Sequence, residues 1–290
     1  MPADAPPTAT LRIACPDRPG LIGEVTALVG ALGGNIIDAD QHTEPPVDPA
    51  DGRFFMRLAI ERDGCDRDAL ESGIAEVAQR RQMRWALNWR DQPARVAVLV
   101  SKQGHCLADL LFRWQSNELE GDIALVAGNH DTHRALAEAT GAPFHHLPVT
   151  TATKESQEQQ LHELLQSNRI DCVVLARYMQ ILSPGFVARW PERIINIHHS
   201  FLPAFPGARP YHRAFDRGVK LIGATSHYVT DDLDEGPIIA QATTAVGHRD
   251  TIDDLVRKGR DLERVVLADA VRAHLQDRIL VSGNKTVVFE

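Results

Sequence analysis

The chain has little of what marks a secreted, membrane-bound or redox-active protein. Its 290 residues include only four cysteines, and no two of them form the C-x-x-C pair of a zinc site or a redox dithiol. No apolar run approaches the roughly 18 residues that a membrane helix needs. The N-terminus lacks the basic start and the apolar stretch of a secretory signal. We therefore expect reduced cysteines, no membrane partner and a cytoplasmic location.

Positive charge is also in short supply. Lys and Arg number 31 against 39 Asp and Glu, which gives a net charge of -8. Proteins that bind nucleic-acid phosphates cluster Lys and Arg, so we expect no nucleic-acid partner and a small-molecule ligand. With 43% hydrophobic residues the composition is typical of a globular protein. At about 100–200 residues per domain, the length predicts two domains.

The two halves of the chain carry different patterns. Over residues 1–90, apolar strands and amphipathic helices follow the order strand, helix, strand, strand, helix, strand, which predicts a ferredoxin-like βαββαβ domain. The joint at residues 90–93 is polar. Over residues 91–290, apolar strands alternate with helices, which predicts a Rossmann-like, mostly parallel α/β domain. The expected strands of this domain are 96–100, 123–127, 172–175, 221–229, 238–242 and 286–289, with one more through Asn196 and His198 and a long helix at 252–274.

Three polar residues of the second domain have the properties of a catalytic group. Asn196 and His198 are two positions apart in a β-branched run, so on a strand they share one face, and the Leu-Pro turn that follows puts them at its carboxyl end. An amide can stabilise an oxyanion, an imidazole can carry a proton, and Asp234 can fix its protonation state or orient a water. The pattern indicates chemistry at a carbonyl group without a metal. The alternative is that Asn196 and His198 cap a strand and Asp234 serves a turn.

These motifs resemble a known superfamily. The run Asn-Ile-His-His-Ser-Phe-Leu-Pro from Asn196, with Gly207 after it and Asp-x-Leu-Asp-x-Gly-Pro-Ile-Ile downstream, is similar to the folate-dependent formyltransferases. The resemblance implies that Asn196, His198 and Asp234 are catalytic. It also implies a folate pocket bordered by Leu175, Met179, Gln180, Ile181, Leu182, Val229, Thr230, Asp231 and Asp232. For Met179, Ile181 and Leu182 the alternative is ordinary core packing.

Within that superfamily the chain most resembles the formyltetrahydrofolate deformylases, in the segment 100–107 and in an N-terminal Asp-Arg-Pro-Gly module. Relatives that formylate a phosphorylated glycinamide have a Gly-rich phosphate loop after the first strand. Here Lys102, Gln103 and His105 would crowd such an anion, so we expect water as the nucleophile. The resemblance implies hydrolysis of 10-formyltetrahydrofolate to formate and tetrahydrofolate, which supplies formate to purine biosynthesis, with no cofactor. The alternatives are formyl transfer to an amine acceptor and a non-catalytic folate or amino-acid sensor.

The N-terminal domain resembles an ACT regulatory module. Free amides at the start of its first helix would receive the carboxylate of an amino-acid effector, and the expected effector site is Asp17, Pro19, Gly20 and Asn35. The family theme suggests glycine or methionine. The alternative is a domain used only for contacts between subunits, and we expect a homo-oligomer, either a dimer or a tetramer.

Other histidines and cysteines carry less weight. His105 and Cys106 are adjacent, and neighbours on a helix do not face each other, so a Cys–His nucleophile is not expected. No acidic or cysteine partner stands at a recognised ligand spacing from the paired histidines, so we expect no metal site. His227 is interpreted as core or as a support of the catalytic residues.

Overall fold

The computed structural model describes residues 8–45, 52–89, 91–204 and 210–290. The chain divides into two compact units, the first formed by Met1–Gln92 with Asp277–Ser282 and Val287–Glu290, the second by Pro93–Gln276 with Gly283–Thr286. The sequence assigns every residue after 90 to one domain, whereas the structure places most of the last fourteen residues with the first unit. Arg90 in the expected joint and Gly207 in the expected motif lie outside the described residues.

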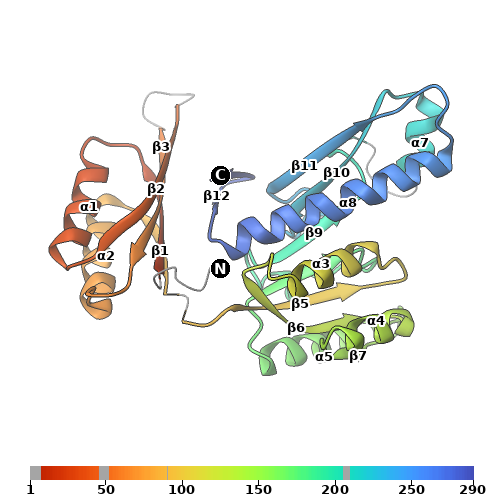
Figure 1. Ribbon diagram of the computed structural model, residues 1–290, viewed down its shortest axis with the longest axis horizontal. Coiled ribbons are helices and arrows are strands. Elements are labelled where there is room, and N and C mark those ends of the chain that lie inside the picture. The colour runs from red at the N-terminus through yellow and green to blue at the C-terminus, as the bar shows by residue number, and fades with distance from the viewer. Residues whose placement is uncertain (1–7, 46–51, 90, 205–209) are drawn as a thin grey trace. The chain divides into compact units, whose positions relative to one another are not determined.

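The first unit has the expected ferredoxin-like order (Figure 1). Its elements are β1 Thr8–Pro16, α1 Leu21–Ala31, β2 Asn35–Glu44, β3 Arg53–Glu61, α2 Arg67–Arg81 and β4 Arg84–Asn88. The strands form an antiparallel sheet in the order β2-β3-β1-β4. Side chains alternate along a strand, so Leu11 and Ile13 of β1 face the core formed with Val25 of α1 and Ile74 of α2. The predicted fold of this unit is confirmed.

The C-terminal segment covers the other face of that sheet. Strand β12 (Ile279–Ser282) contributes Leu280, which packs with Phe55 of β3 and with Phe289 in a second apolar cluster. Arg12 of β1 donates a hydrogen bond to the Ile279 carbonyl at 3.1 Å. The sequence does not predict β12, because its four residues are too few to show a period. Its packing explains why the C-terminus belongs to the first unit.

The second unit is an α/β domain, as expected. Its elements are β5 Ala94–Val100, α3 His105–Gln115, β6 Gly121–Gly128, a 3-10 turn η1 Asp131–His133, α4 Arg134–Ala139, β7 Phe144–His146, α5 Lys154–Ser167, β8 Cys172–Ala176, α6 Pro184–Val187, β9 Ile194–His198, α7 Pro210–Arg217, β10 Leu221–Tyr228, β11 Ile238–Ala245 and α8 Ile252–Leu275. A final strand, β13 (Lys285–Val288), pairs with β12. The seven-stranded sheet has the order β11-β10-β9-β8-β5-β6-β7.

The strand order predicts a ligand crevice at the carboxyl ends of the central strands of this sheet. Strands β5 to β9 run parallel, β10 pairs antiparallel with β9, and β11 pairs antiparallel with β10. From β5 the chain builds first toward β7 and then, from β8, in the opposite direction. Open α/β sheets bind ligands outside the carboxyl ends of the strands where the order reverses. The site is therefore expected at the ends of β5, β8 and β9.

Helices cover both faces of the sheet. Leu161 and Leu165 of α5 and Phe186 of α6 pack in one core cluster, and α3 and α8 lie on the opposite face. The long helix α8 begins at a capping box, in which Thr251 and Asp254 each accept a hydrogen bond from the other's backbone N–H. None of the described helices is both long and apolar enough to cross a bilayer.

The packing of β12 generates a stability prediction. Leu280 is 7% exposed against Phe55 and Phe289, so Leu280→Ala should lower the free energy of unfolding by about 2–5 kcal/mol. Hydrogen exchange should show the loss of amide protection in β1 and β3. Val265→Ala, at an exposed position of α8, is the control. Loss of protection confined to the second unit would contradict the assignment of β12 to the first.

Candidate active site

Strands β9 and β10 bring the predicted catalytic residues together. Asn196 and His198 lie on β9, the last parallel strand, and antiparallel pairing sets His227 of β10 directly opposite Asn196. Asp234 lies in the loop from β10 to β11 in the left-handed region, at φ 58°. Two residues on, any side chain at Gly236 would overlap the Tyr228 carbonyl oxygen. A glycine there lets the loop fold close against β10, which brings Asp234 back to the strand ends.

A hydrogen bond joins His198 to Asp234. The distance from His198 Nδ1 to Asp234 Oδ1 is 3.2 Å, and since an ionised carboxylate only accepts, Nδ1 is the donor. Burial alone would raise the pKa of Asp234, but the interactions of the carboxylate with His198 and His227 together outweigh it and hold that pKa well below its usual range. His198 Nε2 is buried and has no hydrogen-bond partner among the described residues. It is the ring atom left to meet a substrate.

His227 fixes the orientation of the Asn196 amide. Its Nδ1 lies 2.8 Å from the Tyr228 carbonyl oxygen, which can only accept, so the proton is on Nδ1. Its Nε2 then accepts a hydrogen bond from Asn196 Nδ2 at 3.2 Å. One N–H of the amide group is held in this way, and the other can donate elsewhere. The sequence gives His227 only a supporting role because the register of β9 against β10, which decides the contact, is not visible in it.

His199 follows the strand and separates two groups of polar residues. Its ring centroid is 5.0 Å from that of His198 and 6.3 Å from that of Tyr211. Burial, with Arg177 and His198 nearby, lowers the pKa of His199 to about 4, so the ring is neutral at neutral pH. The sequence interprets His199 as a support for the turn.

Behind His199 lies a buried ionic cluster that the sequence misses. Glu263 of α8 is 1% exposed; its Oε2 is 2.8 Å from His105 Nε2 and 3.4 Å from Arg177 Nε, and its Oε1 accepts from the Tyr211 hydroxyl at 2.7 Å. Burial raises the pKa of Glu263, but the hydrogen bond from His105 and the charge of Arg177 more than offset this and keep the group ionised. The partners are more than 50 positions away in the sequence, so no local pattern connects them.

The same cluster includes a geometry that resembles a metal site. Ligand atoms of His105, Cys106 and Glu263 lie within 4.8 Å of one another. However, both Glu263 oxygens already accept hydrogen bonds, and the Arg177 guanidinium would repel a cation. Burial also raises the pKa of Cys106, so its thiol stays protonated and is a poor ligand. The arrangement fits an internal ion pair better than a metal centre.

The nine residues expected at the folate pocket fall into two groups. Leu175 and Leu182 are 5% and 8% exposed and belong to the core under α5 and α6, which is the alternative given above for Leu182. Met179 and Ile181 are 58% and 60% exposed, so their apolar surface is open to contact. The remaining residues are half-buried or exposed: Gln180, Val229, Thr230, Asp231 and Asp232.

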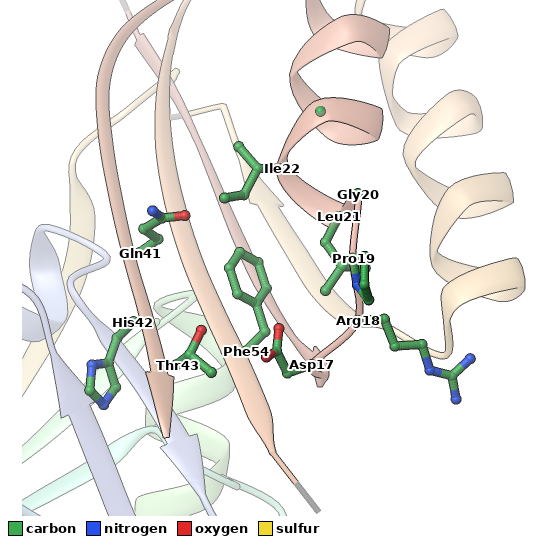
Figure 2. Close-up of a pocket in the computed structure, with 11 residues that line it drawn as sticks. Asp17, Arg18, Pro19, Gly20, Leu21, Ile22, Gln41, His42, Thr43 and Phe54 are labelled. Carbon is green, nitrogen blue, oxygen red and sulfur yellow. The ribbon is translucent and has the colours of Figure 1, made fainter. Parts of the chain in front are cut away.

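The first unit contains a cavity where the effector is expected. It measures about 430 Å³ and lies between the turn at 17–21, the end of β2 and Phe54 (Figure 2). Asp17, Pro19 and Gly20 line it, and no side chain among the described residues caps the start of α1 at Gly20. Asn35 does not line it. That residue is at the opposite end of β2, where its amide donates to Glu61 at 3.0 Å. Gln41, His42 and Thr43 take its place.

Comparison with known proteins agrees with this architecture. A formyl transferase family model matches residues 94–271, and an ACT domain model matches residues 9–64. A formyltetrahydrofolate deformylase from Synechocystis sp. is 52% identical over 284 residues, covering 97% of this chain and 98% of that protein. The crystal structure of a formyltetrahydrofolate deformylase from Pseudomonas syringae pv. tomato has a TM-score of 0.94 at 46% identity and covers 99% of this chain and 96% of that chain.

About two thirds of the chain also resembles a different enzyme. A glycinamide ribonucleotide transformylase from Symbiobacterium toebii has a TM-score of 0.65 at 32% identity, and covers 68% of this chain and 95% of that chain. A formyltransferase-type α/β unit joined to an ACT domain therefore defines the class of the protein. The sequence identity to deformylases extends over nearly the whole chain and shows which family of that class the protein represents. The chain belongs to the formyltetrahydrofolate deformylase family, whose members are hydrolases. The expected family is confirmed.

The low pKa of His199 predicts how acid affects stability. Its pKa of about 4 lies below the 6.5 of an ordinary histidine, so the unfolded chain takes up this proton first. The stability held by neutral His199 is complete above about pH 6.5 and is lost as the pH falls toward 4, by about 1–3 kcal/mol. In urea denaturation between pH 7 and 5, His199→Gln should lose less stability than the wild type. The control is His146→Gln, at an exposed position. If the free energy of unfolding of His199→Gln falls with pH as steeply as that of the control, the prediction is wrong.

Proposed function

We propose that the chain hydrolyses 10-formyltetrahydrofolate to formate and tetrahydrofolate at Asn196, His198 and Asp234. The observation that carries the proposal is the His198–Asp234 hydrogen bond, which leaves His198 Nε2 buried and without a partner among the described residues. Membership in the deformylase family supports the substrate.

The proposed reaction uses the three groups in sequence. His198 acts as an imidazolium, whose Nδ1–H is held by Asp234 and whose Nε2–H faces the formyl group. A water oriented by Asp234 attacks the formyl carbon and passes a proton to this carboxylate, whose low pKa suits it to accepting the proton only as charge develops. The free N–H of Asn196 and the Nε2–H of His198 hold the oxygen of the tetrahedral intermediate. As the C–N bond breaks, His198 gives its Nε2 proton to the leaving nitrogen and then takes up the proton of the formic acid product. Asp234 releases the proton of the water to solvent, and formate and tetrahydrofolate leave.

Two structural features support the folate end of the site. Met179 and Ile181 present exposed apolar surface after β8, and Thr230 to Asp232 follow β10, which is separated from β8 only by β9. Thr230 Oγ1 donates to the Asp232 carbonyl at 3.2 Å, which orders this turn. We propose that a pterin ring lies across these residues, while Leu175 and Leu182 support the surface from the core.

The proposal predicts formate release from 10-formyltetrahydrofolate without any amine. Asn196→Ala, His198→Ala and Asp234→Ala should each lower kcat by about 100-fold or more, because each removes an oxyanion donor or an acid–base group. Circular dichroism should show intact folds. The control is His248→Ala, a histidine at an exposed position of the same unit.

Other outcomes would favour the two alternatives. Formate release only in the presence of an amine would indicate formyl transfer. Tight folate binding without turnover would indicate a sensor. Near-normal turnover in all three alanine variants would contradict the assignment of the catalytic residues even if the reaction is correct.

We also propose that the cavity of the first unit binds a small amino acid that regulates hydrolysis. Its volume suits glycine or methionine, and the uncapped amides at the start of α1 suit a carboxylate. Asp17 is close enough to pair with an ammonium group (Figure 2).

We further propose a cytoplasmic location, which the four free cysteines support. We also propose a homodimer or tetramer, which the exposed edge strand β2 supports.

Two glycines of α1 allow a matched test of the effector cavity. Gly23 lines the cavity and Gly30 does not, and a Cβ at either would meet nothing within 4 Å. Gly23→Leu should fill the cavity and abolish any change in formate release caused by glycine or methionine. Gly30→Leu should respond as the wild type does. Equal responses from the two variants would place the effector elsewhere.

A further inference from the structure

The buried cluster behind His199 has a role in the choice of nucleophile. We propose that Glu263, Arg177, His105 and Tyr211, here called the Glu263 plug, occupy the space in which an amine acceptor would lie and so reserve the site for water. The proposal rests on the deformylase function and extends it to specificity, through residues that touch neither the formyl group nor the folate.

The plug stands at the point of the sheet where ligands are expected. Arg177 ends β8 in the left-handed region, at φ 62°, and its Nε and Nη2 donate to Gln103 Oε1 at 3.1 and 2.9 Å. Gln103 follows β5, so the two side chains bridge the strands between which the strand order reverses. The backbone N–H of Met179 donates to Ser101 Oγ at 2.9 Å and closes the same crevice. Side chains thus fill the crevice that a ligand occupies in other open α/β sheets.

Helix α8 supplies the third wall. Gly259 and Glu263 are four residues apart and share one face of the helix. Any side chain at Gly259 would overlap the Tyr211 ring, so the glycine lets Tyr211 approach α8 and reach Glu263 at 2.7 Å. Arg177 and Tyr211 are 7% exposed and Glu263 is 1% exposed. The plug is therefore a packed part of the domain.

The charges of the plug also oppose a phosphorylated acceptor. A phosphate is commonly bound at a helix N-terminus, and here α3 begins at His105, whose ring is already bonded to Glu263 at 2.8 Å. The Arg177 guanidinium is paired with the Glu263 carboxylate at 3.4 Å. An incoming anion would find the His105 ring and the Arg177 guanidinium already bonded, and a buried negative charge behind them.

The related fold shows why such a plug is needed. The transformylase from Symbiobacterium toebii, by its name, formylates glycinamide ribonucleotide, and its fold matches two thirds of this chain. If two proteins share a fold and a formyl donor, some structural difference between them must decide whether water or a ribonucleotide amine attacks the formyl group. In this chain the His199 ring lies between Tyr211 of the plug and His198. Water passes where an amine with its ribose and phosphate does not fit.

The proposal is tested by the partition of the formyl group. Full-length protein is given 10-formyltetrahydrofolate with glycinamide ribonucleotide or with glycinamide, and formate, tetrahydrofolate and formylated amine are measured by mass spectrometry. The wild type should release one formate for each tetrahydrofolate at every amine concentration. Tyr211→Ala and Glu263→Ser should open the crevice and give formylated amine at about tenfold or more above the detection limit that bounds the wild-type ratio of formylated amine to formate. A merely structural role would lower both products without changing their ratio.

Control variants on the same helices guard against general damage. Phe215→Ala on α7 and Val265→Ala on α8 truncate exposed apolar side chains outside the plug and should leave the ratio at the wild-type value. Folded plug variants that release formate but form no formylated amine would overturn the proposal. Wild-type protein that formylates either amine would overturn it too.

A second measurement covers plug variants that do not fold. Glycinamide ribonucleotide should not inhibit formate release by the wild type, because its place is filled. If glycinamide ribonucleotide inhibits the wild type competitively with 10-formyltetrahydrofolate, the plug proposal is wrong, and this result needs no variant. Absence of formate release by the wild type would instead count against the proposed function, and the plug would then be judged by whether glycinamide ribonucleotide binds the wild type in calorimetry.

Discussion

The hydrogen bond between His198 Nδ1 and Asp234 Oδ1 is the interaction on which the rest of the site depends. It fixes the orientation of the His198 ring, and it requires a loop that returns Asp234 to the end of β9. That return depends on Gly236, which has no side chain to strike the Tyr228 carbonyl, and on the left-handed backbone of Asp234. A contact of 3.2 Å thus specifies the path of the whole β10–β11 connection.

The same strand pair positions the amide. Because β9 and β10 are antiparallel neighbours, His227 lies opposite Asn196, and its tautomer is set one residue further along by the Tyr228 carbonyl. The strand register and the His227 tautomer therefore hold one N–H of the Asn196 amide, and the second N–H is not used in this contact. A hydrogen-bond donor that is already held in its orientation does not have to move during a reaction, and oxyanion donors are most effective when they are preorganised in this way.

Local pattern was enough to predict part of the site. The alternation of β9 placed Asn196 and His198 on one face, and the turn after them placed the pair at a strand end. The pattern could not predict the contact of His227 with Asn196, because that contact depends on the register of β9 and β10. It could not predict the contact of Glu263 with Tyr211 either, because that contact depends on how α7 and α8 pack. In the ACT-like unit the sequence pattern predicted the turn at Gly20, but it did not show which end of β2 lies beside that turn. Asn35, at the start of β2, was therefore expected at the cavity, whereas Thr43, near the end of β2, lines it.

Specificity and chemistry come from opposite sides of one strand end. His198 takes its partner from the loop after β10, whereas the neighbouring His199 lies against Tyr211, which is held by α8. Asp234 and the plug are therefore carried by different elements, so the plug can differ between relatives without moving His198 or Asp234. Buried ion pairs contribute little net stability compared with apolar packing of the same volume. A fully buried Glu263 with three polar partners is thus better explained by the space and charge it denies to an acceptor than by the stability it adds.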